Sequence, residues 1–387
     1  MIINEIVLKV TNICNLNCSY CYVFNQADDS YKRDAPFMSE ETMIFVIKRI
    51  YEHCKTKNIE SFLIIFHGGE PLLLQKNSYI KFRHFCQEFA PGIEIRLALQ
   101  TNGTLLSEEW IALFKELDIS VGVSLDGTES ATKNRIFRST NKNAYSAIIK
   151  GINLLHKNDY PVNILSVINP EENPTEIYHH LKENNISFVD FLFPDETFEN
   201  RKMNNSDISN WLIQIFDLWD NDYSANKPMI RTFEIIMGLI LGVERGNEMF
   251  GSKLNKTVCI KPNGNIQAVD NLMVCGNEFT KTKYSVLNNT IDQAIEDPLI
   301  KRYYYSHSDR ELGYKCQACI IKRICGGGHL AHRYSSKNGF DNPSAYCSDI
   351  FKLVMHIQNK LIDEMPSSLT NQIGIQKITL NDCSIKG

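Results

Sequence analysis

The sequence predicts an α/β fold in which six β–α units form a parallel sheet and a cysteine-rich α+β segment follows. Three observations predict it. Apolar runs of strand length alternate with segments of helical periodicity through about residue 205. The runs are apolar on both faces, which is typical of parallel strands covered by helices. Polar and glycine-rich residues gather where each run ends, which is the edge that carries the active site in β/α barrels.

The expected elements follow one another along the chain. Strands are predicted at residues 6–10, 62–66, 93–99, 119–125, 162–168 and 188–193. Helices are predicted at about 39–54, at 79–89, from 107 onward, at 144–155 and at 175–183, with two more between 205 and 246. Ser39 and Ser107 each precede two glutamates, which suits a helix start because the free N–H groups there attract hydroxyl and carboxylate oxygens. We interpret the aromatic residues of the last two helices as packing residues.

Composition and charge narrow the class of protein. The chain has 387 residues, 43% of them hydrophobic and 22% charged, an ordinary balance for a globular protein of two or three domains. The net charge of −4 gives no basic field that would attract nucleic acid. No apolar run is long enough to cross a membrane, and residue 1 leads into a strand rather than a signal peptide. Twelve cysteines without an export signal indicate a reducing cytoplasm and metal ligation.

The first chemical motif is a group of three cysteines directly after the first predicted strand. Cys14, Cys18 and Cys21 have a C-x3-C-x2-C spacing, and the asparagines between them favour a loop. Three thiolates suit a cubane iron–sulfur cluster whose fourth iron stays open. A structural zinc ion would require four protein ligands, and a disulfide would leave one cysteine over. A chance grouping of buried core cysteines is the remaining alternative.

A second group of cysteines occupies the C-terminal part of the chain. Four of them have the spacing of a closed metal site: Cys316, Cys319, Cys325 and Cys347. Zinc and iron–sulfur fit this spacing equally well, and we favour iron–sulfur because the first motif already indicates a reducible cluster. Cys259 and Cys275 flank a predicted hairpin turn at residues 262–264. We interpret Cys54 and Cys86 as buried apolar residues, and Cys383 has no partner at a suitable spacing.

The first loop resembles the cluster-binding motif of the radical S-adenosylmethionine (radical SAM) enzymes, C-x3-C-x-Φ-C, with Tyr20 at the aromatic position. In that family the open iron binds the amino and carboxylate groups of S-adenosylmethionine. One electron then cleaves the sulfonium and yields a 5′-deoxyadenosyl radical, which is chemistry that the cofactor supplies and the protein directs. The resemblance implies a partial (β/α)6 TIM barrel that is open on one side to admit a large substrate.

The end of the second predicted strand carries a further motif of this family. Gly68, Gly69, Glu70 and Pro71 match its GGEP sequence. The resemblance implies that the glycines let the backbone approach the cofactor amino group closely. It also implies that Glu70 accepts a hydrogen bond from that ammonium. A charge placed at a helix N-terminus is the alternative role for Glu70.

Two more strand ends and one arginine match positions of the same family. Asn102 and Ser124 resemble residues that bind the ribose and methionine ends of the cofactor. Arg135 resembles the arginine that pairs with the cofactor carboxylate, a bidentate role that suits a guanidinium. The spacing here is about one residue short of the usual pattern, so Arg138 remains an alternative. Each of these residues taken alone is typical of ordinary turn chemistry.

The second cysteine group resembles the SPASM extension of radical enzymes that modify peptides and proteins. By the pairing of that family, one auxiliary 4Fe–4S cluster is held by Cys316, Cys319, Cys325 and Cys347. A second would use Cys259, Cys275 and the position of His329, where the family pattern has a cysteine. Histidine replaces cysteine at iron in Rieske centres, but a single histidine is also often a packing residue. The implied division is residues 1–205 for the barrel, 206–257 for a helical bridge, 258–350 for the SPASM domain and 351–387 for a C-terminal helix and tail.

Residues 325–335 and 340–347 are similar to one branch of these enzymes, the maturases that cross-link ribosomally made peptides, including those that form cyclophanes. In that branch the radical attacks the β-carbon of one residue, which bonds to an aromatic ring carbon. The resemblance implies a precursor peptide as substrate and an electron donor such as flavodoxin or ferredoxin. The ring must then lose a proton, and Asp270 is the candidate base, with hairpin capping as its alternative role.

Two other functions remain open. An anaerobic sulfatase-maturating enzyme resembles the chain over its whole length. That family has an aspartate directly after the cysteine matching Cys275, where this chain has Gly276, and it has a fuller cysteine set. A zinc-stabilised peptide-binding scaffold without catalysis is the third possibility. Such a scaffold would not need the GGEP motif and Ser124 together with an open three-cysteine site.

Overall fold

The computed structural model describes residues 1–201 and 207–383. They group into two compact units. The first unit comprises residues 1–125, 132–165 and 256–304, and the second comprises 126–131, 166–255 and the chain from 305 onward. The predicted boundary between residues 205 and 206 lies outside the described residues, and the four-part division of the chain stays a prediction.

Nine strands of the described chain form one sheet, in the order β7-β6-β5-β4-β3-β2-β1-β8-β9. They are β1 (Glu5–Thr11), β2 (Ser61–Gly68), β3 (Glu94–Thr101), β4 (Ile119–Ser124), β5 (Asn163–Val167), β6 (Phe188–Leu192), β7 (Met229–Ile230), β8 (Thr257–Ile260) and β9 (Ile266–Gln267). Strands β1 to β5 pair in parallel in chain order, β8 joins β1 in parallel, and β9 runs antiparallel to β8. This is the consecutive order of a partial β/α barrel, and the six predicted strands are confirmed as β1 to β6.

Helices follow the strands at the predicted places. The first are α1 (Glu40–Lys57), α2 (Lys76–Phe89), α3 (Glu108–Leu117), α4 (Tyr145–Lys157) and α5 (Pro174–Glu183). After β6 come α6 (Ile208–Asp220), α7 (Arg231–Ile240), α8 (Ile291–Ala294), α9 (Pro298–Tyr304), α10 (Tyr314–Gln317), α11 (Lys322–Cys325), α12 (Cys347–Glu364) and α13 (Ser367–Ile373). Ser39 caps α1 and Ser107 caps α3, since their hydroxyls accept hydrogen bonds from the N–H groups of Thr42 and Trp110. Both predicted helix starts are therefore confirmed.

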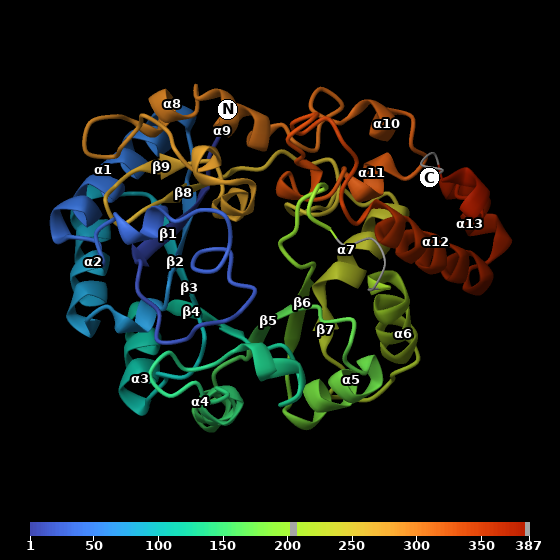
Figure 1. The fold of residues 1–387 in the computed structure, drawn as a ribbon, viewed down its shortest axis with the longest axis horizontal. Helices are drawn as coiled ribbons and strands as arrows, with labels where there is room; N and C mark the ends of the chain where they lie inside the picture. The colour runs from blue at the N-terminus through green and yellow to red at the C-terminus, as the bar shows by residue number, and fades with distance from the viewer. Residues whose placement is uncertain (202–206, 384–387) are drawn as a thin grey trace. The chain divides into compact units, whose positions relative to one another are not determined.

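In the first unit, one face of the strands packs on helices and the other carries polar side chains. Phe66 of β2 packs edge to face against Tyr79 and Phe82 of α2, with ring centres 5.0 Å apart in both pairs. Figure 1 shows α1, α2 and α3 along this outer side of the strands. His67 points to the opposite face, because side chains alternate along a strand. There it lies beside Lys9 of β1, its partner in the parallel register. The inner face therefore carries polar side chains near the carboxyl ends of the strands.

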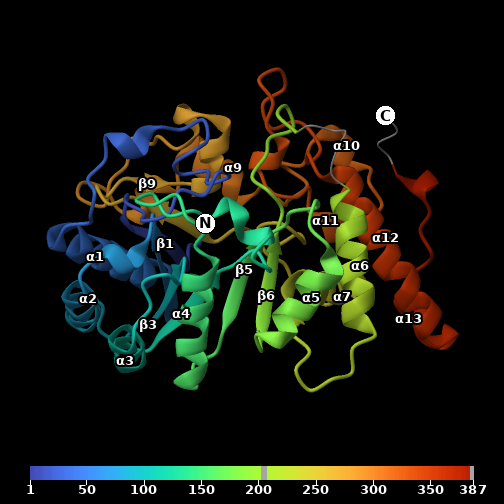
Figure 2. The same ribbon diagram turned by 60° about the horizontal axis from the view of Figure 1, so that its bottom comes forward.

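In the second unit the helices pack on one another. Helices α6 and α12 run side by side, as Figure 2 shows. Helix α6 buries Trp211, Phe216 and Trp219, so the prediction that these aromatic residues pack is confirmed. The predicted pair of helices corresponds to α6 and α7, and its expected first residue, 205, lies outside the described residues. No helix in the described part of the chain is both long and apolar enough to cross a membrane.

Strands β8 and β9 form the predicted hairpin, and Cys259 pairs with Gln267 across it. Cys275 lies beyond the hairpin, at the end of the 3-10 helix η4 (Asp270–Cys275). Asp270 begins η4, and its carboxylate contacts Lys9 and Tyr22. The alternative role of Asp270 as a hairpin cap is therefore wrong.

Candidate active site

The cysteine loop leaves the end of β1 and places three thiols near one another. Cys14, Cys18 and Cys21 are all half-buried. Burial is the main cause that raises the pKa of Cys14 to about 12, and the nearby Glu70, Cys18 and Cys21 contribute. Neighbouring thiolates repel one another, so these thiols ionise only when a cation stabilises them. The iron of an iron–sulfur core provides that positive charge. The loop therefore fits the cluster that its spacing predicts.

The choice between a cluster and a single ion depends on the number and spacing of the cysteines. The first loop supplies three thiols, whereas a structural zinc site needs four protein ligands. The second group supplies four, a number that suits iron–sulfur and zinc alike. Among residues 1–201 and 207–383, no group of three or more His, Cys, Asp or Glu side chains is close enough to hold one metal ion.

Gly68 and Gly69 hold the cysteine loop against the end of β2. The N–H of Gly69 donates to the carbonyl of Thr11 and the N–H of Glu70 donates to that of Ile13, both at 2.8 Å. A Cβ atom on Gly69 would lie 2.1 Å from the Ile13 oxygen, and one on Gly68 would lie 2.1 Å from the Thr11 oxygen. The close approach that requires glycine is thus made to the loop backbone. The implied approach to the cofactor amino group stays a prediction.

Replacing Gly69 with alanine is expected to push the cysteine loop off the strand end. The added methyl group cannot fit 2.1 Å from a carbonyl oxygen, so the backbone must move. We expect the free energy of unfolding to fall by about 1–3 kcal/mol and iron binding to fall about tenfold. Thermal melting and iron content after anaerobic reconstitution measure the two effects. Gly92→Ala is the control for iron content, because a Cβ atom there meets nothing within 4 Å and its φ of +77° makes alanine costly for the local backbone alone. Full iron content in the Gly69→Ala protein would contradict this role.

The Glu70 carboxylate is fully buried and accepts three hydrogen bonds. The donors are Leu72 N at 3.0 Å, Thr101 Oγ1 at 2.7 Å and Asn102 N at 2.8 Å. Glu70 therefore caps the 3-10 helix η2 (Pro71–Leu73) and ties the ends of β2 and β3 together. Burial raises the pKa of Glu70 to about 7, although these hydrogen bonds act to lower it. The alternative role at a helix N-terminus is thus observed, and contact with the cofactor ammonium stays a prediction.

The raised pKa of Glu70 predicts a pH dependence of stability. A carboxyl group whose pKa is higher in the folded than in the unfolded state stabilises the fold at pH values below its unfolded-state pKa. That stabilisation is lost as the pH rises from about 4.5 to about 7. We expect the apo-protein to lose on the order of 1–3 kcal/mol of unfolding free energy over this range through Glu70. Glu70→Gln should remove this loss. Urea unfolding at several pH values measures it, and identical pH profiles for the two proteins would contradict the assignment.

Asn102 and Ser124 lie at neighbouring strand ends. The Nδ2 atom of Asn102 donates to Asn15 Oδ1 at 2.9 Å and lies 3.8 Å from Cys14 Sγ. The Oγ atom of Ser124 accepts from Gln100 Nε2 at 2.9 Å. Asn102 thus contacts the first cysteine of the loop. The contacts of both residues with the cofactor stay predictions.

Both candidate arginines lie against the cysteine loop. Arg135 is buried, and its guanidinium carbon lies 5.4 Å from the ring centre of Tyr20. The Nε atom of Arg138 donates to the Cys14 carbonyl at 3.1 Å, and its guanidinium carbon lies 4.9 Å from the ring centre of Phe24. A positive charge beside this loop suits a carboxylate ligand. Arg135 is the buried one of the two arginines, and it stays our candidate for the cofactor carboxylate.

Three polar residues that surround the candidate base Asp270 were not predicted. Lys9 Nζ pairs with Asp270 Oδ2 at 3.2 Å, and the Tyr22 hydroxyl donates to the same oxygen at 2.7 Å. Burial lowers the pKa of His67, the nearby charge of Asp270 acts to raise it, and that of Lys9 acts to lower it. We call Lys9, Tyr22, His67 and Asp270 the Asp270 cluster. The one signal in the sequence was a lysine within an apolar strand.

The Asp270 cluster holds its carboxylate in the charged form. Burial alone would raise the pKa of Asp270. The charge of Lys9, with the hydrogen bonds from Tyr22 and Lys9, outweighs burial and lowers that pKa below its ordinary range. Asp270 is therefore ionised at neutral pH, as a general base must be. Cys259 of β8 is close to this cluster, and burial raises the pKa of its thiol to about 12.

The four cysteines of the predicted auxiliary site come together within the second unit. They lie in α10, the following turn, α11 and the start of α12: Cys316, Cys319, Cys325 and Cys347. Burial raises the pKa of Cys347 far above its ordinary value, and the other three cysteines add to the effect. Four thiols in this relation fit a closed iron–sulfur centre. Cys383 also acts on Cys347, a neighbour that the sequence did not predict.

Arg333 fixes the loop that follows Cys325. Its side chain is fully buried and donates to the carbonyl groups of Gly326, Gly327 and Gly328 at 2.9–3.0 Å. The three glycines have φ angles of 61°, 82° and 68°, in the left-handed region that favours glycine. Consecutive left-handed residues turn their carbonyl groups towards one guanidinium. The buried Arg333 therefore fixes the backbone that directly follows Cys325.

The residues predicted for a second auxiliary cluster divide between the two units. Cys259 and Cys275 belong to the first unit, and His329 belongs to the second. Within the second unit, the ring centres of His329 and His332 are 5.2 Å apart, and His329 Nε2 lies 3.9 Å from Glu248 Oε1. Shared ligation of a cluster by Cys259, Cys275 and His329 stays a prediction.

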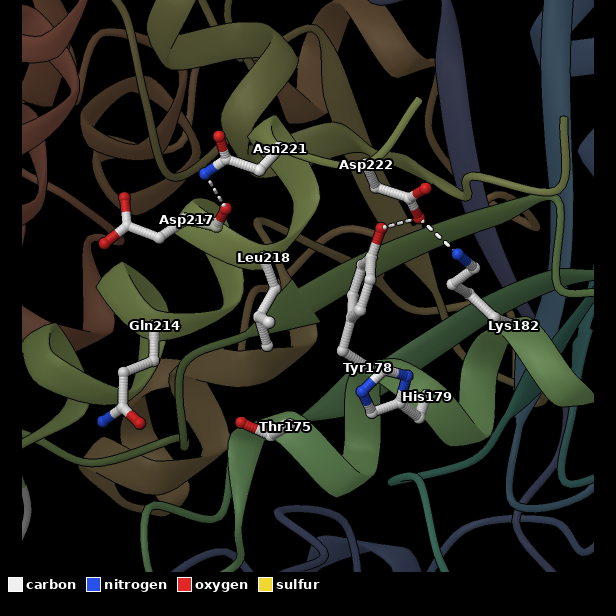
Figure 3. Close-up of a pocket in the computed structure, with 9 residues that line it drawn as sticks. All are labelled: Thr175, Tyr178, His179, Lys182, Gln214, Asp217, Leu218, Asn221 and Asp222. Atoms are coloured by element: carbon white, nitrogen blue, oxygen red, sulfur yellow. Dashed lines mark hydrogen bonds and ion pairs between the residues drawn. The ribbon is translucent and has the colours of Figure 1, made fainter. Parts of the chain in front are cut away.

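An open pocket in the second unit lies between α5 and α6 (Figure 3). Within it, Asp222 Oδ2 accepts from the Tyr178 hydroxyl at 2.7 Å and pairs with Lys182 Nζ at 2.7 Å. None of the residues that the sequence predicts for the active site lines this pocket. Its side chains come from the outer helices and not from the carboxyl ends of the strands.

Known proteins share this fold along almost the whole chain. The chain is 25% identical to a serine-type anaerobic sulfatase-maturating enzyme from Bacteroides thetaiotaomicron, covering 98% of this chain and 95% of that protein. The solved structure of native anSMEcpe with bound AdoMet matches with a TM-score of 0.79 at 23% identity, covering 93% of this chain and 98% of that one. Streptococcus suis SuiB bound to its precursor peptide SuiA matches with a TM-score of 0.58 at 16% identity, covering 85% and 72% of the two chains.

A family model matches the N-terminal part of the chain. Residues 8–183 match the model of the radical SAM superfamily. This range runs from within β1 to the end of α5 and includes the cysteine loop and the GGEP strand end. Residues 8–183 therefore form a radical SAM domain, and the protein is a radical SAM enzyme whose cofactors are S-adenosylmethionine and a 4Fe–4S cluster.

Proposed function

We propose that this enzyme forms a carbon–carbon cross-link between a β-carbon and an aromatic side chain of a ribosomally made precursor peptide. In this proposal Cys14, Cys18 and Cys21 hold the cluster with the open iron. The residues proposed to hold S-adenosylmethionine are those of the loop, the strand ends and one arginine: Tyr20, Gly68, Gly69, Glu70, Pro71, Asn102, Ser124 and Arg135. When bound, these cofactors supply a 5′-deoxyadenosyl radical that abstracts hydrogen.

One observation favours cross-linking over sulfatase maturation. It is the position of the Asp270 carboxylate. Gly276 has a φ of +118°, which L side chains rarely adopt. An aspartate at this position, where the sulfatase-maturating family has its base, would therefore be strained. Asp270 instead offers an ionised carboxylate beside Lys9 on the inner strand face. This supports a reaction whose proton acceptor is Asp270, as restoring an aromatic ring requires.

The other partners follow from the same proposal. The likeness to SuiB, solved with its precursor peptide, supports a peptide substrate. We assign a SPASM-type auxiliary cluster, as acceptor of the electron that the ring loses, to Cys316, Cys319, Cys325 and Cys347. A further centre would use Cys259, Cys275 and His329. Flavodoxin or ferredoxin would reduce the first cluster, and a reducing cytoplasm suits the free thiols.

Sulfatase maturation is the second candidate function. Similarity to the serine-type sulfatase-maturating enzyme over 98% of the chain favours it. The φ angle of Gly276, which an aspartate would rarely adopt, and the histidine at position 329 count against it. Both reactions act on a peptide, so the product distinguishes them.

Co-expression with a short, aromatic-containing precursor peptide encoded beside this chain tests the proposal. Cross-linking removes two hydrogen atoms and leaves a peptide that does not fragment between the joined residues. Formylglycine formation instead leaves an aldehyde that reacts with hydroxylamine. We expect a peptide that lacks two hydrogens and does not react. An aldehyde on a sulfatase peptide, with no cross-linked precursor, would establish the second candidate and overturn the first.

A further inference from the structure

The Asp270 cluster joins elements that are far apart in the sequence. Lys9 of β1 is 2% exposed and Asp270 at the start of η4 is 7% exposed. His67 of β2 is the register partner of Lys9, so both side chains lie on the same face of the strands. The Nδ1 atom of His67 is buried without a hydrogen-bond partner. Burying charges in this way costs desolvation energy, and perturbed charged groups of this kind concentrate at functional sites.

The hydrogen bonds of Asp270 leave one of its oxygen atoms available. Lys9 at 3.2 Å and the Tyr22 hydroxyl at 2.7 Å both contact Oδ2. Within the described ranges, Oδ1 accepts no hydrogen bond. Lys9 Nζ also lies 3.7 Å from Met273 Sδ and 5.7 Å from the ring centre of Tyr22, so several neighbours fix its position. The carboxylate is therefore held through one oxygen and presents lone pairs on the other.

On the basis of the proposed function, we propose that Lys9 is a positioning residue that, with Tyr22, fixes Asp270 so that Oδ1 takes the proton from the newly joined ring carbon. The C–H bond at that carbon breaks and its proton passes to Oδ1. The bonding electrons stay with the ring, which regains aromaticity, and one surplus electron leaves to an oxidised iron–sulfur centre. Asp270 becomes a neutral acid. Lys9 does not touch the reacting atoms.

A purely structural ion pair is the competing explanation, and the second unit contains a matched example. Asp222 accepts from Tyr178 and pairs with Lys182 through the same Oδ2 atom, as Figure 3 shows. Lys182 Nζ lies 5.9 Å from the ring centre of Tyr178. These three residues repeat the contacts of Lys9, Tyr22 and Asp270, but on α5 and the segment after α6. The Lys182 side chain is 21% exposed and that of Lys9 is 2% exposed, so Lys182→Met reports the effect of losing the lysine from such a group at a less buried site.

The test compares Lys9→Met, Lys9→Arg and Lys182→Met in the reconstituted holoenzyme with the precursor peptide. The readouts are cross-linked peptide formed per 5′-deoxyadenosine, and iron content. For Lys9→Met we expect normal iron and cofactor cleavage with a ratio about 10- to 100-fold lower, the loss that follows when a catalytic group is misplaced. Lys9→Arg should recover most of the ratio because it keeps the charge. Lys182→Met should keep the wild-type ratio.

Two results would overturn this role of Lys9: an unchanged ratio in Lys9→Met, or an equal fall in Lys182→Met. Loss of one partner of a buried pair is strongly destabilising. If Lys9→Met does not fold, Tyr22→Phe decides, because it removes only a hydroxyl. A lower ratio in Tyr22→Phe supports the proposal and an unchanged one overturns it. Failure of the proposed function is a different result, because the wild-type enzyme itself would then yield no cross-linked peptide.

Discussion

Replacing Cys18 with alanine is expected to abolish the formation of 5′-deoxyadenosine from S-adenosylmethionine. Three thiolates leave one iron of a cubane open, and a loop with two thiolates no longer defines that arrangement. The half-buried Cys18 acts directly on Cys14, so its loss changes the site itself and not a distant element. We expect cofactor cleavage to fall by more than about 100-fold, beyond the effect of losing an outer-shell partner of a metal site.

The measurement is 5′-deoxyadenosine after reduction with dithionite, together with iron content. Cys86→Ala is the matched control. Cys86 is buried in α2, where it packs as an apolar residue. Its loss should lower stability by about 1 kcal/mol while cofactor cleavage continues. Cleavage by Cys18→Ala at the wild-type rate would show that the cluster is held elsewhere.

Replacing Cys347 with alanine is expected to separate cofactor cleavage from product formation. Cys347 begins α12 in the second unit, whereas the cysteine loop belongs to the first, so this substitution removes no residue of the unit that carries the loop. Without Cys347 the auxiliary centre keeps three of its four thiolates and the proposed electron acceptor is impaired. We expect 5′-deoxyadenosine to form while cross-linked peptide falls by about 100-fold or more.

Mass spectrometry of the peptide and quantification of 5′-deoxyadenosine in the same reaction measure this uncoupling. Cys383→Ala is the control, because Cys383 is a neighbour of Cys347 but stands outside the proposed ligand set. It should keep both activities. Cross-linked peptide at the wild-type yield in Cys347→Ala would show that the auxiliary centre is not required.

The sequence predicted what depends on residues close together in the chain. Ser39 and Ser107 cap their helices through N–H groups three positions away. Consecutive β–α units place neighbouring strands side by side, so the order from β1 to β6 followed from their alternation. The spacing of Cys316, Cys319 and Cys325 likewise brought these thiols to one place.

Contacts between distant segments account for what was not predicted. Tyr22 and Asp270 are 248 positions apart, and no local pattern joins them. A lysine in an apolar strand indicates a buried charge, but its partner becomes known only from the fold. The sequence also did not show why position 69 must be glycine. The carbonyl group that leaves no room for a side chain there belongs to Ile13 of the cysteine loop.

The central claim is that the cysteine loop holds an open iron–sulfur cluster that cleaves S-adenosylmethionine. Anaerobically reconstituted protein is analysed for iron, sulfide and zinc, and then for 5′-deoxyadenosine after reduction. We predict iron and sulfide in equal amounts, enough for the open cluster and at least one auxiliary cluster, and 5′-deoxyadenosine only when reductant and S-adenosylmethionine are both present. Zinc in place of iron, with no 5′-deoxyadenosine, would contradict the claim.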